Sequence, residues 1–93
     1  MSDQTVEDVI IGLVQELIED WGLDDIAVTR DTTLKGDMGF ESADTMQIFT
    51  AIVEHYRGVD FKFQHLVMKD NKFVDDLTVG QIVVFVIKKL QEA

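Results

Sequence analysis

The stretch SADTMQIFTAIVEHY, residues 42–56, is typical of an amphipathic helix. Its apolar side chains recur at steps of three and four, in the series Met46, Phe49, Ile52, Val53 and Tyr56. Ser is a preferred N-cap residue, so we expect this helix to begin at Ser42. Gly58 follows the series, and a glycine commonly ends a helix. A helix with one apolar stripe needs other elements to cover that stripe, and the flanking sequence offers them.

The N-terminal region predicts a longer helix with the same spacing. Its apolar residues are Val6, Val9, Ile10, Leu13, Val14, Leu17, Ile18 and Trp21. Thr5 with Asp8 resembles a capping box, and Ser2 or Asp3 are alternative starts. Gly22 marks the expected end.

A further helix is predicted over residues 78–91. Thr78 and Gln81 fit a capping box, and Lys88 and Lys89 suit a helix C-terminus. The run IVVFVI, residues 82–87, is also compatible with a buried strand. The cap, the length and the lack of an obvious partner strand favour the helix.

Two long connectors join these helices. Residues 22–41 contain scattered apolar anchors, namely Leu23, Ile26, Val28, Leu34, Met38 and Phe40. Residues 58–77 are rich enough in apolar residues for a short helix near 64–69, and we expect Phe61, Phe63 and Phe73 to cover the last helix. The prediction is an all-α fold: a single domain over residues 1–93, a small four-helix bundle with a long loop between its first and second helices.

Composition excludes several classes of function. The 93 residues carry 8 Lys and Arg against 18 Asp and Glu, for a net charge of −10, which disfavours nucleic acid and anionic membranes as partners. Residues 1–46 contain 12 acidic and 2 basic side chains, whereas residues 47–93 contain 6 of each. The chain has no Cys, and no apolar run suggests a signal peptide or membrane span. We therefore expect a cytoplasmic, monomeric protein that does not insert into membranes.

Catalytic and metal-binding patterns are weak. The G-x-S-x-G motif of many Ser hydrolases is absent. Residues 31–42 place a glycine as an EF-hand loop does, but Thr33, Lys35 and Ser42 stand where that loop needs ligands. His55 and His65 have no spacing typical of a metal site. We expect no catalytic residue and no metal ion.

One motif is more specific. Residues 37–44 read DMGFESAD, which resembles the signature D-L-G-x-D-S-L-D of the acyl carrier protein family. Helix order, spacing and acidic charge agree with that family across nearly the whole chain. The resemblance implies a carrier of acyl thioesters that is a substrate of other enzymes and not itself an enzyme, with 4′-phosphopantetheine transferred from coenzyme A onto Ser42. From its position by itself, Ser42 is better explained as an N-cap residue, and it is the surrounding motif that favours the modification site.

The resemblance also implies partners: a phosphopantetheinyl transferase, and acyl-loading and acyl-transferring enzymes with basic patches. The residues expected to contact them are Glu41, Ala43, Asp44, Gln47, Val53 and Glu54. Four of these depart from the family pattern, since Glu41 replaces Asp, Ala43 replaces Leu, and Gln47 and Val53 stand where fatty-acid carriers usually have Glu. The segment between Tyr56 and Val79 is also longer than usual. These departures favour a specialised fatty-acid, lipid or polyketide pathway, with acyl chains entering the bundle beside Ile52 and Val53.

Two alternatives remain open at this stage. The chain is also compatible with a carrier of aminoacyl or peptidyl groups. From a different class, it is compatible with an unmodified acidic helical interaction module that docks through residues 42–57.

Overall fold

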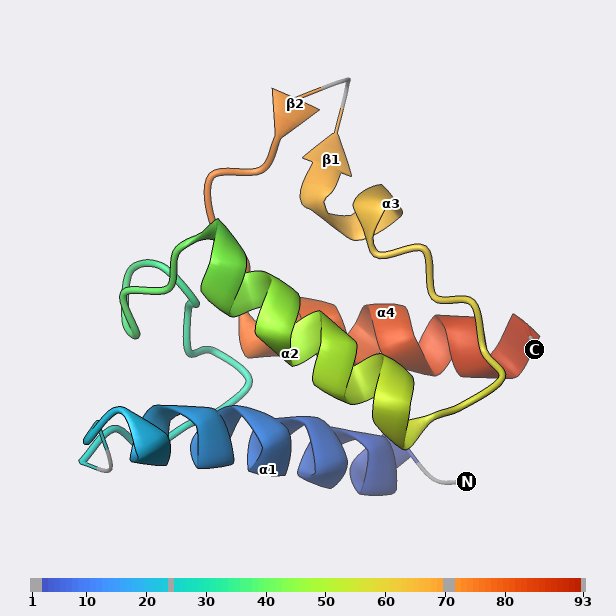
Figure 1. Cartoon of the computed structure of the whole chain (residues 1–93). Coiled ribbons are helices and arrows are strands. Elements are labelled where there is room, and N and C mark those ends of the chain that lie inside the picture. The colour runs from blue at the N-terminus through green and yellow to red at the C-terminus, as the bar shows by residue number, and fades with distance from the viewer. Residues whose placement is uncertain (1–2, 24, 70–71, 93) are drawn as a thin grey trace.

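The computed structural model describes residues 3–23, 25–69 and 72–92. The chain is mostly helical (Figure 1). The elements are α1 (Asp3–Asp20), α2 (Ser42–His55), α3 (Gln64–Val67), β1 (Met68–Lys69), β2 (Lys72–Phe73) and α4 (Val79–Glu92). This agrees with a small helical bundle, and the long loop lies where it was expected.

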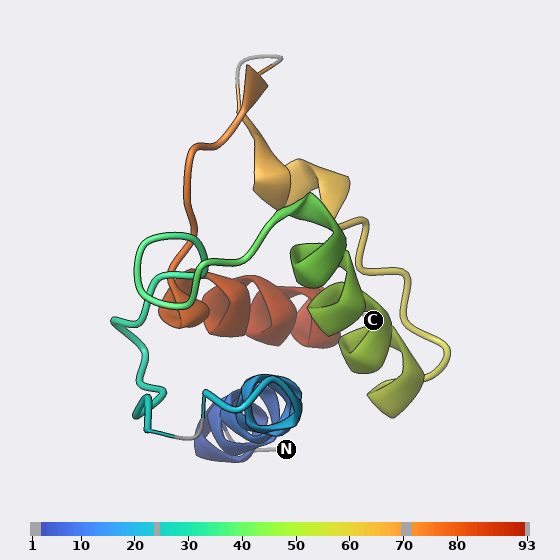
Figure 2. The same cartoon turned by 60° about the vertical axis from the view of Figure 1, so that its left-hand side comes forward.

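The three long helices enclose the core. α1 packs against both α4 and α2, and α2 runs obliquely across the other two (Figures 1 and 2). The predicted stripe of α1 supplies Val6, Ile10, Val14 and Ile18, all fully buried or nearly so. Burial of such side chains contributes about 1.5–3 kcal/mol each, so the helix pairs depend on this stripe.

The strand alternative for residues 82–87 is wrong, because the whole run lies inside α4. The helix interpretation is confirmed together with its cap: the Thr78 N–H donates to Gln81 Oε1 at 2.8 Å, and the Gln81 N–H donates to Thr78 Oγ1 at 3.1 Å. These two bonds satisfy N–H groups that the first turn leaves without helical partners. Ile82, Val83 and Val86 face the core, whereas Val84 is exposed.

α2 differs from its prediction in two respects. Its N-cap is Glu41, and Ser42 is the first helical residue, so the expected Ser42 cap is wrong. The buried face consists of Ile48, Phe49 and Ile52, while Met46 and Val53 are 57% and 43% exposed. The helical period is as predicted, but the buried side includes Ile48 and leaves out Met46 and Val53. α1 is the long helix that packs on α2.

The second connector is less helical than expected. The short helix ends at Val67, and Met68–Lys69 and Lys72–Phe73 pair as a small antiparallel hairpin, so the all-α prediction needs this correction. The hairpin projects away from the three long helices (Figure 2). Phe61 and Phe63 are buried, and Phe63 contacts Phe85 of α4 at 5.5 Å between ring centres, as predicted. The side chain of Phe73, the third expected covering residue, lies outside the described residues.

Within the described part of the chain, none of the helices combines the length and the apolar character that crossing a membrane requires.

Candidate functional site

Residues 33–40, before α2, form a loop that is closed by hydrogen bonds between its own residues. The Thr33 N–H donates to Asp37 Oδ2 at 2.8 Å, and the Asp37 N–H donates to Thr33 Oγ1 at 2.9 Å. The Phe40 N–H donates to the Leu34 carbonyl at 2.8 Å. Gly39 adopts a φ of +70°, a conformation that costs other residues energy, so the turn into α2 needs a glycine at this point.

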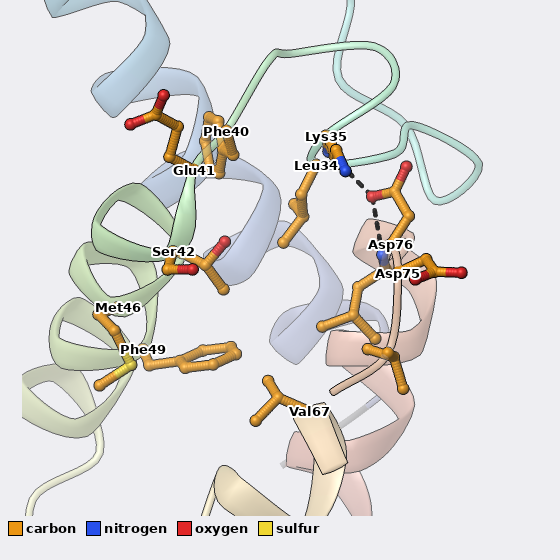
Figure 3. A pocket seen from close by; sticks show the side chains of 13 residues that line it. Leu34, Lys35, Phe40, Glu41, Ser42, Met46, Phe49, Val67, Asp75 and Asp76 are labelled. Carbon is orange, nitrogen blue, oxygen red and sulfur yellow. Dashed lines mark hydrogen bonds between the residues drawn. The ribbon is translucent and has the colours of Figure 1, made fainter. Parts of the chain in front are cut away.

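Asp76 holds this loop against the start of α4. Its carboxylate accepts the backbone N–H groups of Lys35 and Leu77 at 2.9 and 2.8 Å (Figure 3). It also accepts the backbone N–H of Gly36 at 3.0 Å. Gly36 permits the approach, because a Cβ there would lie 2.8 Å from Thr33 Oγ1 and 3.3 Å from Asp76 Oδ2. The Leu34 N–H also donates to the Leu77 carbonyl at 2.8 Å. The loop is thus anchored to an element 40 residues away in sequence.

Two opposing effects act on the Asp76 carboxyl. Burial by itself would raise its pKa, but the backbone N–H groups of Lys35, Gly36 and Leu77 and the charge of Lys35 outweigh burial. The pKa of Asp76 therefore lies below the ordinary value of 3.8. The group is ionised at neutral pH and accepts all three bonds as a carboxylate.

Ser42 stands free at the first position of α2. Asp44 accepts the Glu41 backbone N–H at 2.9 Å, and the Glu41 carbonyl accepts the N–H groups of Asp44 and Thr45. Because Glu41 and Asp44 cap the helix, the Ser42 hydroxyl is not needed for capping. It is exposed and makes no hydrogen bond within the described part of the chain. It lies beside the positive end of the helix dipole.

A half-open cavity of about 470 Å³ lies beside Ser42, between the first turns of α2 on one side and Val67 and residues 74–77 on the other (Figure 3). Its apolar lining comes from Leu34, Phe40, Met46, Phe49, Val67, Val74 and Leu77. Ile52 and Val53 do not line it, so the expected entry beside them is not where the cavity opens. Trp21 packs edge-on against Phe40, with ring centres 5.2 Å apart.

Four charged residues are among those that line the cavity. They are Lys35, Glu41 and Asp75, which are exposed, and Asp76, which is half-buried. These four residues carry three carboxylates and one ammonium. The local field at the Ser42 end of α2 is negative, in keeping with the acidic first half of the chain.

The sequence-predicted contact residues lie at the N-cap of α2 and along the helix. Glu41, Ala43, Gln47, Val53 and Glu54 are exposed, and Asp44 is half-buried because it caps the helix. Sequence reasoning missed Asp76, Val67 and Val74 as parts of the site. An acidic pair directly before a predicted helix start was the available signal for Asp76.

Among the described residues, no three His, Asp or Glu side chains lie close enough together to hold a metal ion. Comparison of the chain with protein-family models, with curated proteins and with solved structures found no significant match.

Proposed function

We propose that this protein is an acyl carrier protein, modified on Ser42 with 4′-phosphopantetheine and loaded with acyl groups as thioesters. The observation that supports this most directly is the free hydroxyl of Ser42: it is exposed, leads α2 and is relieved of capping by Glu41 and Asp44. The motif DMGFESAD and its resemblance to the carrier signature add the chemical identity of the group.

The modification would proceed by phosphoryl transfer. The Ser42 Oγ attacks the phosphorus of coenzyme A that bears the pantetheine, and a P–O bond to Oγ forms. The P–O bond to the adenosine 3′,5′-bisphosphate breaks, and that nucleotide leaves. The hydroxyl proton passes to a base on the transferase or to water. The resulting thiol then holds acyl groups, a role for which this Cys-free chain has no side chain.

The start of α2 suits a phosphodiester. The first N–H groups of a helix lack helical acceptors and point toward an anion placed there, and the helix dipole adds to this attraction. Lys35, which lines the same cavity, supplies a positive charge. Glu41, Asp75 and Asp76 oppose it, so we expect the arm to extend away from these carboxylates and into reach of partner enzymes.

The decisive experiment is the intact mass of the protein after incubation with coenzyme A, Mg²⁺ and a broad-specificity phosphopantetheinyl transferase. We expect an increase equal to one phosphopantetheinyl group. Ser42→Ala should abolish it. Ser2→Ala is the matched control, because Ser2 and Ser42 are the two serines of the chain, and it should leave the increase intact.

No mass increase in the native chain, or one that persists in Ser42→Ala, would contradict the proposal. The first result would favour the unmodified interaction module, with the exposed face of α2 as its docking surface.

The partner enzymes can be examined through two positions on α2. Gln47 is exposed and neutral, and Val53 is exposed and apolar, where resemblance to fatty-acid carriers leads one to expect Glu. Gln47→Glu with Val53→Glu should raise turnover by ordinary fatty-acid-synthesis enzymes and steepen its salt dependence, because each exposed pair is worth about 0–1 kcal/mol and is screened. If the native carrier already serves those enzymes as well as their own carrier does, the specialised pathway must be abandoned.

A further inference from the structure

Acidic side chains occupy the C-terminal end of α1, where they oppose the helix dipole. Glu16, Glu19 and Asp20 are exposed, and no basic residue lies in the last turn. None of the three forms an ion pair within the described part of the chain. The C-terminal end of a helix is negative, so carboxylates destabilise it, whereas Lys or Arg would stabilise it. Charges that break a local rule without a gain for the fold are typical of an interaction surface.

Trp21 follows these charges directly, on a backbone that is firmly held. The Gly22 N–H donates to the Glu19 carbonyl at 3.0 Å, and the Leu23 N–H donates to the Ile18 carbonyl at 2.9 Å. Gly22 adopts a φ of +78°, the left-handed conformation with which a glycine commonly closes a helix. In the view of Figure 1 this end of α1 reaches past α2 and α4.

The Trp21 ring is only partly covered. It packs edge-on against Phe40, with ring centres 5.2 Å apart, yet the residue is 39% exposed. Trp is enriched among the residues that contribute most to protein interfaces, and a side chain on a fixed backbone loses less freedom when a partner binds. The end of α1 thus presents an apolar anchor beside unpaired carboxylates, apart from the exposed face of α2.

We infer that Trp21, Glu16, Glu19 and Asp20 form a docking surface, the α1 surface, for a basic segment of a partner protein that places an Arg on the Trp21 ring. The planar guanidinium group stacks on an aromatic ring and also pairs with carboxylates, and Trp is the best ring for this contact. Nucleic acids and anionic membranes do not fit, because the carboxylates repel them. Binding at the α1 surface does not depend on modification of Ser42.

The probe is a short peptide with three Arg residues separated by Gly-Ser pairs, added to the native protein without a phosphopantetheine arm. Trp21 is the single tryptophan of the chain, so its fluorescence reports binding at the α1 surface. Backbone amide NMR shifts locate the peptide, and those of residues 16–23 should change most. Shifts confined to other parts of the chain, or no binding at all, would overturn the inference.

The same peptide with Lys in place of Arg should bind about two- to threefold more weakly, because an ammonium group does not stack on the ring. With Glu in place of Arg it should not bind. Equal binding of the Arg and Lys peptides would exclude a guanidinium stacked on Trp21.

Substitutions at Trp21 separate the ring from simple apolar contact. Trp21→Leu keeps an apolar side chain beside Phe40 but removes the aromatic face, so it should weaken binding about two- to fivefold, with Trp21→Phe between Leu and native. NMR follows both variants, and their Tm values check the fold. Val84→Ala is the matched control, because Val84 is also exposed but lies on α4, and it should leave binding unchanged. Native affinity in Trp21→Leu would exclude Trp21 as the anchor.

The carboxylates are tested along the same helix. Asp20→Asn should weaken binding about two- to threefold and reduce its salt dependence, whereas Asp8→Asn, an exposed acid in the first half of α1, should change binding clearly less. Asp20→Asn should also raise the Tm, because Asp20 opposes the helix dipole. Equal binding losses in the two variants would reduce the effect to net charge, and a lower Tm in Asp20→Asn would show that Asp20 serves the fold.

The α1 surface and the proposed function can fail separately. Modification of Ser42 in a chain that does not bind the Arg peptide would overturn the α1 surface and leave the carrier intact. Peptide binding by a chain that no transferase modifies would support the surface and remove the carrier proposal. Sedimentation should show a monomer, since a dimer with Trp21 in its interface would mean that a second copy, and not a basic partner, covers the ring.

Discussion

The first connector, residues 21–41, and the second connector, residues 56–78, are similar in length but are anchored differently. The first runs antiparallel to the start of α4 through backbone bonds, including Val79 N–H to the Thr32 carbonyl at 2.9 Å and Gly80 N–H to the Arg30 carbonyl at 2.8 Å. Asp76 and the Thr33–Asp37 pair add side-chain bonds. Hydrogen bonds have defined directions, so this connector presents Ser42 in one orientation.

The second connector is anchored by rings. Phe63 stacks on Phe49 at 4.2 Å and on Phe61 at 5.3 Å between ring centres, and it also contacts Phe85. Apolar packing is strong but weakly directional, so it fills space rather than orienting a particular group. The comparison indicates a division of roles. The first connector, held by hydrogen bonds and called the polar connector below, positions the site. The second connector, held by aromatic rings and called the apolar connector, supplies stability and one wall of the cavity.

The largest effect should come from the apolar connector. Phe61 is 1% exposed, and Phe61→Ala should lower the free energy of unfolding by about 3–5 kcal/mol. Thermal or denaturant unfolding measures this. Phe85→Ala is the control. Because Phe85 is half-buried, this substitution should lower the free energy of unfolding by clearly less. Equal losses in the two variants would contradict the role given to Phe61.

A substitution in the polar connector should lower the free energy of unfolding less than Phe61→Ala does, and should affect function more. Asp76→Asn replaces one of the two acceptor oxygens by an amide donor. We expect it to lower the free energy of unfolding by about 1–2 kcal/mol, an effect that the partial exposure of Asp76 reduces. Under the proposed function, a loop that is less often in position should raise the KM of the transferase severalfold at similar kcat. Asp75→Asn is the matched control, with the same charge removed. If both variants behave alike, Asp76 acts through charge and does not position the loop.

The Asp76 contribution should also depend on pH. Its pKa is lowered in the folded protein, so its stabilisation is present above the ordinary value of 3.8 and is lost as pH falls through the lower folded value. The stability difference between the native chain and Asp76→Asn should therefore be constant near neutral pH and should vanish in strong acid. A difference that already disappears near pH 6 would exclude this assignment.

The smallest effect on stability is expected from a change at Tyr56, where α2 meets the second connector. The Tyr56 hydroxyl is buried without a hydrogen-bond partner among the described residues, and burial raises the pKa of Tyr56 above 10.0. Tyr56→Phe removes this unpaired group and keeps the ring contact with Phe61, so it should be neutral or stabilise by up to about 1 kcal/mol. Calorimetry of the two proteins measures the change, and a loss above 1 kcal/mol would show that the hydroxyl has a partner.

Much of the fold was predictable because local signals agreed with each other. The period of α1, the Thr78–Gln81 cap and the apolar anchors Leu34, Met38 and Phe40 all describe interactions within a few residues or a choice between core and solvent. The hairpin of residues 68–73 was missed, since strands of two residues have no period to detect.

The sequence by itself determined the helical period, the polar connector's motif and the acidic field around Ser42, because these depend on residue type and spacing along one segment. Tertiary structure decided which face of α2 is buried, that Glu41 rather than Ser42 caps the helix, and that Asp76 reaches back to Lys35 and Gly36. It also decided where the cavity opens. Each of these depends on contacts between segments far apart in the chain, and hydrophobic spacing carries no information about which distant segment closes over a given side chain.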